Sequence, residues 1–235
     1  MLFRSGRCWR GRLLRSPVGW AEVARRGVTR GKFITLEGGE GVGKSTQAAR
    51  LADALRARGI DVVVTREPGG TPGAEAIRDL LMTGSEDRWS ARAEALLFAA
   101  ARADHVEKVI KPALERGAWV ICDRFIDSTR AYQGGAGGVS DEDILALHKI
   151  GSRGLLPDRM LLLSMPVFDA SLRTYDRDGP NVDRFAAKEG TYFDVVAAKF
   201  EQLAQIEPDR IKIVDATGAI DAVSERLFTA VIDFF

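Results

Sequence analysis

A glycine-rich segment near the start of the chain has the residue types that bind phosphate. Residues 38–45 read Gly-Gly-Glu-Gly-Val-Gly-Lys-Ser and fit the pattern G-x-x-x-x-G-K-[ST]. Glycines let consecutive backbone N–H groups surround a phosphate, and the N-terminus of a following helix adds positive potential. Lys44 can reach the outer phosphates and Ser45 can hold Mg²⁺. The segment therefore predicts a nucleoside triphosphate site, with Mg²⁺ as cofactor. We expect its residues to be Gly38, Gly39, Glu40, Gly41, Val42, Gly43, Lys44, Ser45 and Thr46.

A second polar pair, Asp123-Arg124, directly follows the apolar run 119–122. A carboxylate at the end of a buried strand can hold Mg²⁺ or its waters, as in other proteins with such a phosphate-binding loop. An arginine can hold a phosphate through two parallel hydrogen bonds. We therefore expect Asp123 to act with Lys44 in catalysis and with Ser45 in metal binding, although a structural ion pair is the alternative interpretation.

Phe98 and Arg102 are four residues apart in a segment with helical periodicity. On a helix they project side by side. A planar base could stack on the ring while the guanidinium donates hydrogen bonds. The alternative for Phe98 is an ordinary core position, but an arginine on the same stripe is hard to bury without a partner.

Residues 171–189 are rich in arginine, aspartate and glycine, which favours a charged surface loop. Phosphoryl transfer places charge on the migrating group, and cationic side chains must neutralise it. The glycine-rich loop contains no arginine. The residue types alone predict a solvated surface here, and the expectation that Arg177 or Arg184 supplies this cation comes from the family resemblance given below.

The elements that must position these residues alternate between strand and helix. Apolar, β-branched runs predict five strands, and stretches of helical spacing lie between them. This order predicts one α/β domain with a parallel sheet covered on both faces, whose ligands bind at the carboxyl ends of the strands. The strands are expected at 33–36, 60–65, 119–122, 160–163 and 211–214. The helices are expected after Lys44 and at 91–114, 141–150, 192–203 and 220–232.

The charge is unevenly distributed along the chain. The net charge is +1, but residues 1–27 carry seven arginines and one acid, which leaves −5 for residues 28–235. We expect 1–27 to be a disordered basic leader that is not native, and the native protein to begin near Val28. An organellar transit peptide and a nucleic-acid-binding arm are the alternatives. The mildly acidic domain, 28–235, predicts no nucleic-acid partner.

Composition excludes several classes of protein. With 46% hydrophobic and 29% charged residues the chain has ordinary globular usage. Two cysteines far apart and two histidines cannot form a zinc cluster or a disulfide framework, and a reducing, cytoplasmic compartment follows as the expectation. No apolar run approaches the ~20 residues of a membrane helix. A GTPase is disfavoured, because the only asparagine, Asn181, is followed by Val182 rather than by Lys-x-Asp.

Five segments together resemble the thymidylate kinase family, from about Gly31 to the C-terminus. They are 33–46, 65–71, 97–102, 123–125 and 128–134. The resemblance implies a P-loop NTPase fold of three α/β/α layers, with a central five-stranded parallel sheet and a short arginine-bearing lid at about 171–189. It also implies a homodimer that phosphorylates dTMP to dTDP with ATP.

The same resemblance assigns the substrate-binding residues. It places thymine against Phe98 and Arg102, with Thr129 and Gln133 at the base edge and Tyr132 beside the deoxyribose. It implies that Glu40 binds the 3′-hydroxyl and that Arg78 and Arg124 bind the acceptor phosphate, although a solvated surface position is the alternative for Arg78. The lid departs from the family at Ala186, and the later helix at Val195 and Ala197, so the choice between Arg177 and Arg184 stays open.

The expected reaction is in-line transfer of the γ-phosphoryl group of ATP to dTMP, without a covalent enzyme intermediate. Two alternatives remain at this stage. One is a kinase of another nucleoside monophosphate, and the other is a nucleotide-binding regulator without transferase activity.

Overall fold

The computed structural model describes residues 29–166, 168–170, 173 and 190–235. Within this part, five strands form one parallel sheet in the order β2-β3-β1-β4-β5. The predicted leader and most of the predicted lid, including Arg177 and Arg184, lie outside the described residues. The strands are β1 (Phe33–Glu37), β2 (Val62–Arg66), β3 (Trp119–Asp123), β4 (Arg159–Ser164) and β5 (Ile211–Asp215). The five predicted strands and their parallel arrangement are confirmed.

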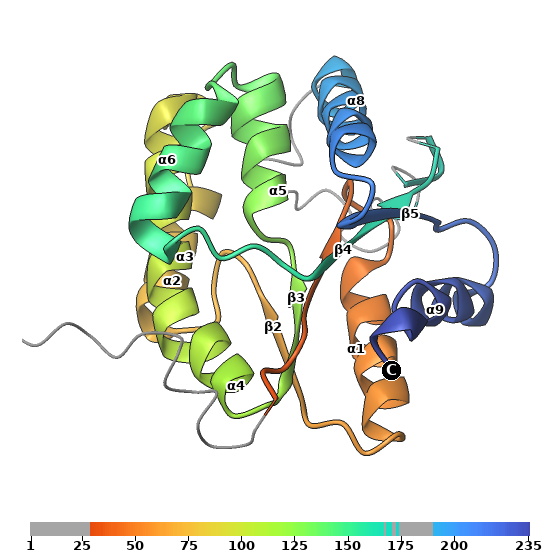
Figure 1. Ribbon diagram of the computed structural model, residues 1–235. Helices are drawn as coiled ribbons and strands as arrows, with labels where there is room; N and C mark the ends of the chain where they lie inside the picture. The colour runs from red at the N-terminus through yellow and green to blue at the C-terminus, as the bar shows by residue number, and fades with distance from the viewer. Residues whose placement is uncertain (1–28, 167, 171–172, 174–189) are drawn as a thin grey trace, which may run out of the picture.

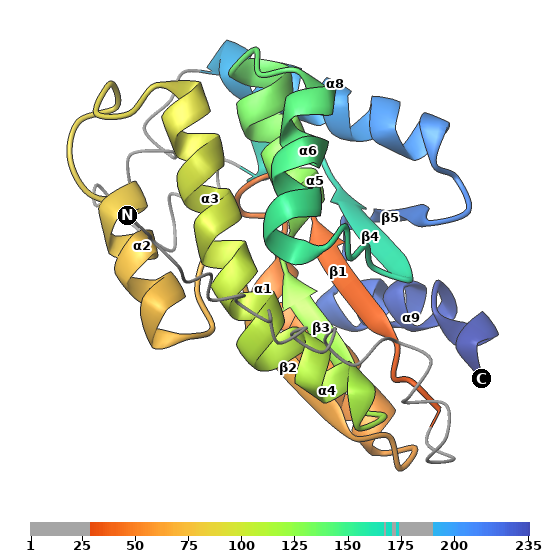
Figure 2. The same cartoon turned by 60° about the vertical axis from the view of Figure 1, so that its left-hand side comes forward.

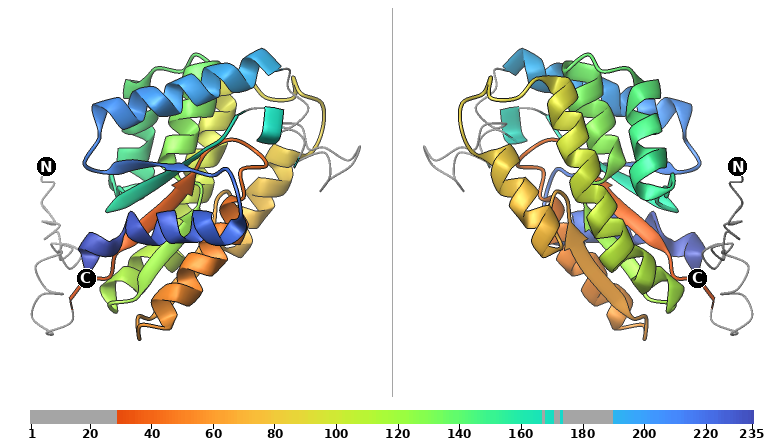
Figure 3. Two further views of the ribbon diagram at one scale, coloured as in Figure 1. Left: turned by 90° about the vertical axis from the view of Figure 1, so that its right-hand side faces the viewer. Right: turned by 90° about the vertical axis from the view of Figure 1, so that its left-hand side faces the viewer.

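Helices cover both faces of the sheet, which gives the three predicted layers (Figures 1 and 3). One face carries α1 (Lys44–Arg56) and α9 (Ile220–Thr229), which Figure 1 shows to the right of the sheet. The other face carries α3 (Ala91–His105), α4 (Lys111–Glu115), α5 (Ile126–Thr129), α6 (Asp141–Ser152) and α8 (Gly190–Ile206). Helix α2 (Pro72–Met82) packs on the outer side of α3 (Figure 2).

Two helices differ from the predicted pattern. The predicted helix 91–114 is continuous, but residues Val106–Ile110 (η2) form a π-helical segment between α3 and α4. The segment Arg130–Ala136 (η3) continues α5 as a second π-helical stretch, where no helix was predicted. The chain ends in a short turn of 3₁₀ helix, Ile232–Phe234 (η4), after α9. Because π-helical turns are frequent at functional sites, η3 marks a region of interest.

The core follows from the alternation of side chains along the strands. Ile34, Leu36 and Ile121 point to the face covered by α1 and α9. Their neighbours Phe33 and Val120 point to the opposite face, where they pack against α4 and the start of α6. A third apolar cluster joins β4 and β5 to η3 and α8. The sheet is therefore buried on both sides, as its apolar strands require.

The register places the carboxyl ends of the central strands at one edge. Leu36 of β1 lies beside Asp123 of β3, and Arg66 of β2 lies beside the same aspartate. The loops that follow β1, β2 and β3 therefore leave the sheet side by side. No helix in the described part of the chain has the length and apolar character needed to cross a bilayer.

Candidate active site

The loop between β1 and α1 has the conformation that a phosphate cradle requires. Gly43 precedes the first residue of α1 with φ 91°, a left-handed conformation that glycine adopts without strain. A Cβ on Gly38 would lie 2.4 Å from the carbonyl oxygen of Leu163, so only glycine allows the loop to pass β4 at this distance. The Val42 side chain is buried in the core below the loop. Any contact of Val42 with a phosphate is therefore through its backbone.

Lys44 is held against this loop. Its Nζ donates hydrogen bonds to the carbonyl oxygens of Gly39, at 2.5 Å, and Gly38, at 3.3 Å. Burial, and after it the charge of Arg124, lower the pKa of Lys44 against the opposing effect of nearby carboxylates, and the net result is a pKa of about 8. A phosphate would replace the two carbonyl partners with a full negative charge, so the ammonium is placed to bind an anion at the loop.

Ser45 of α1 and Asp123 of β3, the two predicted metal ligands, contact each other. The hydroxyl of Ser45 donates to Oδ2 of Asp123 over 2.5 Å. A hydroxyl and a carboxylate are hard oxygen donors of the kind that Mg²⁺ takes in nucleotide sites, where waters and phosphate oxygens complete its shell. The residues present at this position therefore fit Mg²⁺.

Arg124 is tied to the loop across the cleft. Its Nη2 forms an ion pair with Glu40, and its Nη1 donates to the carbonyl oxygen of Gly38 and to Ser128 Oγ, at 3.2 and 3.1 Å. Its backbone has φ 69°, which is strained for a residue with a side chain. This left-handed conformation turns the chain sharply at the end of β3, so that Asp123 and Arg124 both reach the cleft.

Glu37, at the end of β1, holds this turn from below. Its two carboxyl oxygens bond the backbone N–H of Phe125, at 2.7 Å, and the hydroxyl of Ser128, at 2.5 Å. Burial, and after it the charge of Asp127, raise the pKa of Glu37 to about 8, against the lowering effect of its hydrogen bonds and of Arg124. Glu37 is not among the predicted site residues, because a glutamate at the end of an apolar strand carries no distinctive signal.

Arg102 is buried and has a buried partner that the sequence analysis missed. Its Nε donates to Oε2 of Glu67 over 2.7 Å, and Nη2 donates to Oγ1 of Thr129 over 2.9 Å. The other oxygen of Glu67 is 3.0 Å from Nδ1 of His105. The guanidinium is therefore fixed in one orientation, with its donors directed to one end of the cleft.

The remaining predicted base-binding residues surround Arg102. Phe98 is half-buried one helical turn earlier on α3, and Thr129 and Gln133 come from α5 and η3. The Arg124 guanidinium lies 5.2 Å from the centre of the Tyr132 ring. Within the described residues the buried Tyr132 hydroxyl has no hydrogen-bond partner, and burial raises the pKa of Tyr132 to about 12. A neutral hydroxyl is thus available to a ligand.

Arg78, on α2, projects toward the loop after β2. Its Nη1 donates to the carbonyl oxygen of Pro68 over 3.0 Å. In the same loop, Glu75 accepts from the backbone N–H of Gly70 and from Arg66, at 2.9 and 3.0 Å. The loop is therefore fixed to α2, and both arginines lie at its surface toward the cleft.

These residues line one cleft of about 430 Å³ at the carboxyl edge of the sheet. Most of the predicted site residues border it. They are Glu40, Gly41, Gly43, Lys44, Ser45, Thr46, Arg78, Phe98, Arg102, Asp123, Arg124, Thr129, Tyr132 and Gln133. Gly38, Gly39 and Val42 lie in the loop without lining the cleft. The cleft has further lining residues that were not predicted, namely Arg66, Glu67, Pro68, Met82, Phe125 and Ser128.

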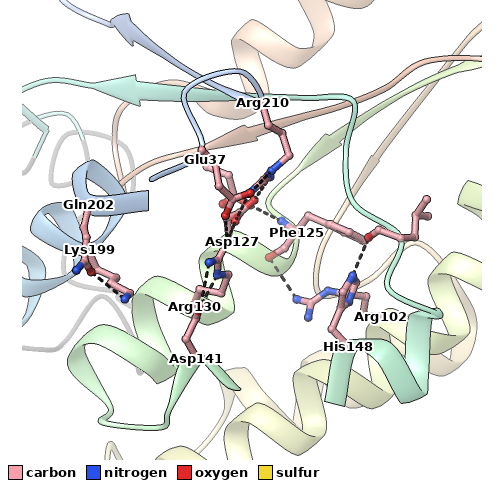
Figure 4. A network of polar contacts seen from close by, with 12 residues as sticks. Glu37, Arg102, Phe125, Asp127, Arg130, Asp141, His148, Lys199, Gln202 and Arg210 are labelled. Carbon is pink, nitrogen blue, oxygen red and sulfur yellow. Dashed lines mark hydrogen bonds and ion pairs between the residues drawn. The ribbon is translucent and has the colours of Figure 1, made fainter. Parts of the chain in front are cut away.

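An ion-pair network supports the helix that carries Thr129 and Gln133, two of the predicted base-binding residues (Figure 4). Both carboxylate oxygens of the fully buried Asp127 accept from Arg210, at 2.7 and 2.9 Å, and one also accepts from Arg130. Arg130 in turn binds Asp141 of α6 through two hydrogen bonds and Glu207 after α8 through a third. The network joins α5 and η3 to α6 and to the loop before β5, and so fixes the wall on which Thr129 and Gln133 stand.

The fold and the cleft define a P-loop protein of the nucleotide-binding α/β class. The thymidylate kinase family model matches residues 36–227. A thymidylate kinase of Rhizorhabdus wittichii is 62% identical over 86% of this chain and 98% of its own length. A thymidylate kinase of Caulobacter vibrioides is 49% identical over 87% of this chain and 98% of its own length. The crystal structure of thymidylate kinase from Ehrlichia chaffeensis has a TM-score of 0.70 and 30% identity over 86% of this chain and 99% of that one. The chain belongs to the thymidylate kinase family.

Proposed function

We propose that this chain transfers the γ-phosphoryl group of ATP to dTMP within the cleft described above, giving ADP and dTDP. Membership of the family makes the chain a nucleoside monophosphate kinase that acts on dTMP. One observation carries the placement of the reaction: the glycine-rich loop and the pair formed by Phe98 and Arg102 border the same cleft. With the donor phosphates held by the loop and the acceptor base held by the pair, the γ-phosphate of ATP and the phosphate of dTMP meet at Asp123 and Arg124.

The donor is held by the loop and by Lys44. Backbone N–H groups at the start of α1 and the Lys44 ammonium bind the phosphates of ATP. When its phosphates displace the carbonyls of Gly38 and Gly39, Nζ gains an anionic partner at no further cost of desolvation. The lowered pKa of Lys44 is then restored toward its ordinary value, because a charge now faces it.

The acceptor is aligned by side chains from three elements. Phe98 stacks on thymine, Arg102 donates to a carbonyl oxygen of the base, and Tyr132 closes on the deoxyribose. Arg124 and Arg78 bind the monophosphate. Binding requires Arg124 to exchange its ion pair with Glu40 for the phosphate, which leaves the Glu40 carboxylate to accept from the 3′-hydroxyl.

Ser45 and Asp123 would hold Mg²⁺. When bound, the ion neutralises negative charge on the phosphates of the donor. The protein's own contribution is to position the two phosphates in line and to exclude water. Among the described residues no arginine lies in the glycine-rich loop, so Arg177 or Arg184 supplies the cation that faces the migrating group.

We propose further that the enzyme is a cytoplasmic homodimer. The reducing environment of the cytoplasm suits its two distant cysteines. For the dimer, the neighbouring helices α3 and α6 expose Leu96 and Ile150, at 56% and 81%, on their outer sides. A second copy covering these apolar side chains would remove them from water.

An assay coupled to ADP formation tests the reaction. Wild-type protein with ATP and Mg²⁺ is expected to form ADP in proportion to added dTMP, and faster with dTMP than with dUMP, dCMP or dGMP. If ADP forms faster with another monophosphate, that nucleotide and not dTMP is the acceptor. ADP formation no faster than that of a Lys44→Ala variant would leave a nucleotide-binding regulator as the function.

A further inference from the structure

Gln133 of η3 and Glu94 of α3 face each other behind the base-binding end of the cleft. Nε2 of Gln133 donates to Oε2 of Glu94 over 3.0 Å, and the two residues are 2% and 5% exposed. Gln133 lines the cleft and Glu94 does not. Burying a carboxylate costs free energy that a pair of apolar residues would not cost. Glu94 has no part in the reaction proposed above, and its contact with Gln133 connects it to the cleft.

The carboxylate of Glu94 fixes the orientation of the Gln133 amide. A glutamine amide can turn by 180° and exchange its oxygen and nitrogen, but an ionised carboxylate only accepts hydrogen bonds. Turning the amide would oppose two oxygens and leave buried groups unpaired, which costs free energy. The nitrogen of Gln133 therefore faces Glu94. Its Oε1, which has no hydrogen bond to the described part of the chain, stays an acceptor for a ligand.

Arg102 gives the same end of the cleft a fixed donor. Nε is held by Glu67, and Nη2 by Thr129 and the carbonyl oxygen of Phe125. Within the described residues Nη1 is the nitrogen left to donate to a ligand, and a guanidinium cannot accept. A ligand base therefore meets donors from Arg102 and an acceptor from Gln133. Thymine and uracil match this pattern, because a ring N–H lies beside a carbonyl oxygen. Cytosine has a ring acceptor beside an amino donor. Its ring acceptor would face the oxygen of Gln133, and its amino donor would face the donor of Arg102.

We propose that Glu94 is a positioning residue that sets pyrimidine specificity: by fixing the Gln133 amide, it makes the site accept a base with a ring N–H and reject one with a ring acceptor. This inference rests on the proposed function, since it places the acceptor base beside Phe98 and Gln133. It goes further by assigning the choice of base to a side chain that touches neither substrate.

The test is the variant Glu94→Gln, which keeps the size and shape of the side chain but can donate as well as accept. Its kcat/KM for dTMP is expected to fall about tenfold, while that for dCMP is expected to hold or rise, because the amide of Gln133 can now turn. The preference for dTMP over dUMP stays unchanged, since the two bases share the edge concerned. The KM for ATP and the thermal midpoint also stay close to wild type. Glu201→Gln, an exposed position on α8, is the matched control.

The reverse exchange supplies a second variant. In Glu94→Gln/Gln133→Glu, position 133 again presents only an acceptor, and discrimination between dTMP and dCMP is expected to return in part. A ligand tests the same point in wild-type protein. Thymidine monophosphate methylated at N3 lacks the ring N–H and is expected to bind far more weakly than dTMP.

An unchanged ratio of kcat/KM for dTMP to kcat/KM for dCMP in Glu94→Gln would overturn the inference. If both values fell equally, the role of Glu94 would be structural. Tight binding of the N3-methylated nucleotide would overturn it without any variant. These failures leave dTMP turnover by the wild type intact. Absence of wild-type turnover is instead the failure of the proposed function, so the two are distinguishable.

Discussion

The hydroxyl of Ser45 lies 2.5 Å from Oδ2 of Asp123, although 78 residues separate them in the chain. The sheet produces this contact, because β1 and β3 are neighbours and Leu36 lies beside Asp123. The first turn of α1 then passes over the end of β3. An oxygen pair suited to Mg²⁺ is therefore present beside Lys44 as a consequence of strand order.

Replacing the carboxylate of this pair tests its proposed role. Asp123→Asn removes a charge from the metal-binding position and is expected to lower kcat by about 100-fold or more and to raise the Mg²⁺ concentration needed for half-maximal activity. Titration of activity with Mg²⁺ measures both effects. Asp61→Asn, at an exposed ion pair with Arg116, is the control. An unchanged Mg²⁺ requirement in Asp123→Asn would rule out this carboxylate as a metal ligand.

Lys44 is predicted to favour function at the expense of stability. Its folded-state pKa of about 8 is below the ordinary value of 10.5, so the charged form is destabilised in the folded protein. Below pH 8 the full cost is present, and it disappears as pH rises from 8 to 10.5. Lys44→Met is therefore expected to abolish turnover yet to unfold with a free energy up to about 3 kcal/mol greater than wild type at pH 7.

Urea unfolding at several pH values measures this difference. The advantage of Lys44→Met over wild type is expected to be constant below pH 8 and to shrink toward pH 10.5, since only wild type loses a cost there. A variant less stable than wild type at pH 7 would contradict the proposed cost of burying the ammonium.

Phe98 is predicted to serve one of the two substrates. Phe98→Ala removes the ring proposed to stack on thymine, and the KM for dTMP is expected to rise about tenfold while that for ATP changes little. Initial rates with each substrate varied in turn give both constants. Ile206→Ala, at an exposed apolar position on α8, should change neither. Similar losses of affinity for ATP and dTMP would contradict the proposal that Phe98 stacks on thymine.

Asp127 is predicted to contribute most of the stability of the ion-pair network that supports α5 and η3. Asp127→Asn removes the fully buried carboxylate that accepts from Arg210 and Arg130, although both arginines keep Glu207 as a partner. The substitution is expected to lower the free energy of unfolding by about 1–3 kcal/mol. Asp143→Asn breaks an exposed ion pair with Arg92 and should cost less than about 1 kcal/mol. Denaturant titration of the two variants compares them directly. Equal effects would show that the buried network contributes no more than a surface pair.

The parts of the fold that sequence predicts are those with local causes. The glycine-rich loop and the five strands follow from motif and periodicity, and both are present in the structure. The helix at 126–136 was missed, because Gly134 and Gly135 follow a short segment without amphipathic spacing. It forms because Arg130 and Asp127 are held by groups from α6 and from the loop before β5, which is tertiary information.

The same division applies to the site. Phe98, Arg102 and Asp123 could be proposed from residue type and position, since each has a chemical reason to be there. Glu67 and Glu94 could not, because each acts through a partner more than 30 residues away, at 35 and 39 positions. A buried carboxylate becomes visible only when the fold shows what it holds.

The central claim is that ATP and dTMP occupy one cleft, with their phosphates meeting at Asp123. A single ligand tests it most directly: adenosine and thymidine joined through five phosphates, titrated by calorimetry. The account predicts one molecule bound per chain, much more tightly than ATP or dTMP alone, and displacement of both nucleotides by it. If saturating amounts of this ligand left either nucleotide binding at full affinity, the two sites would be separate and the account would be wrong.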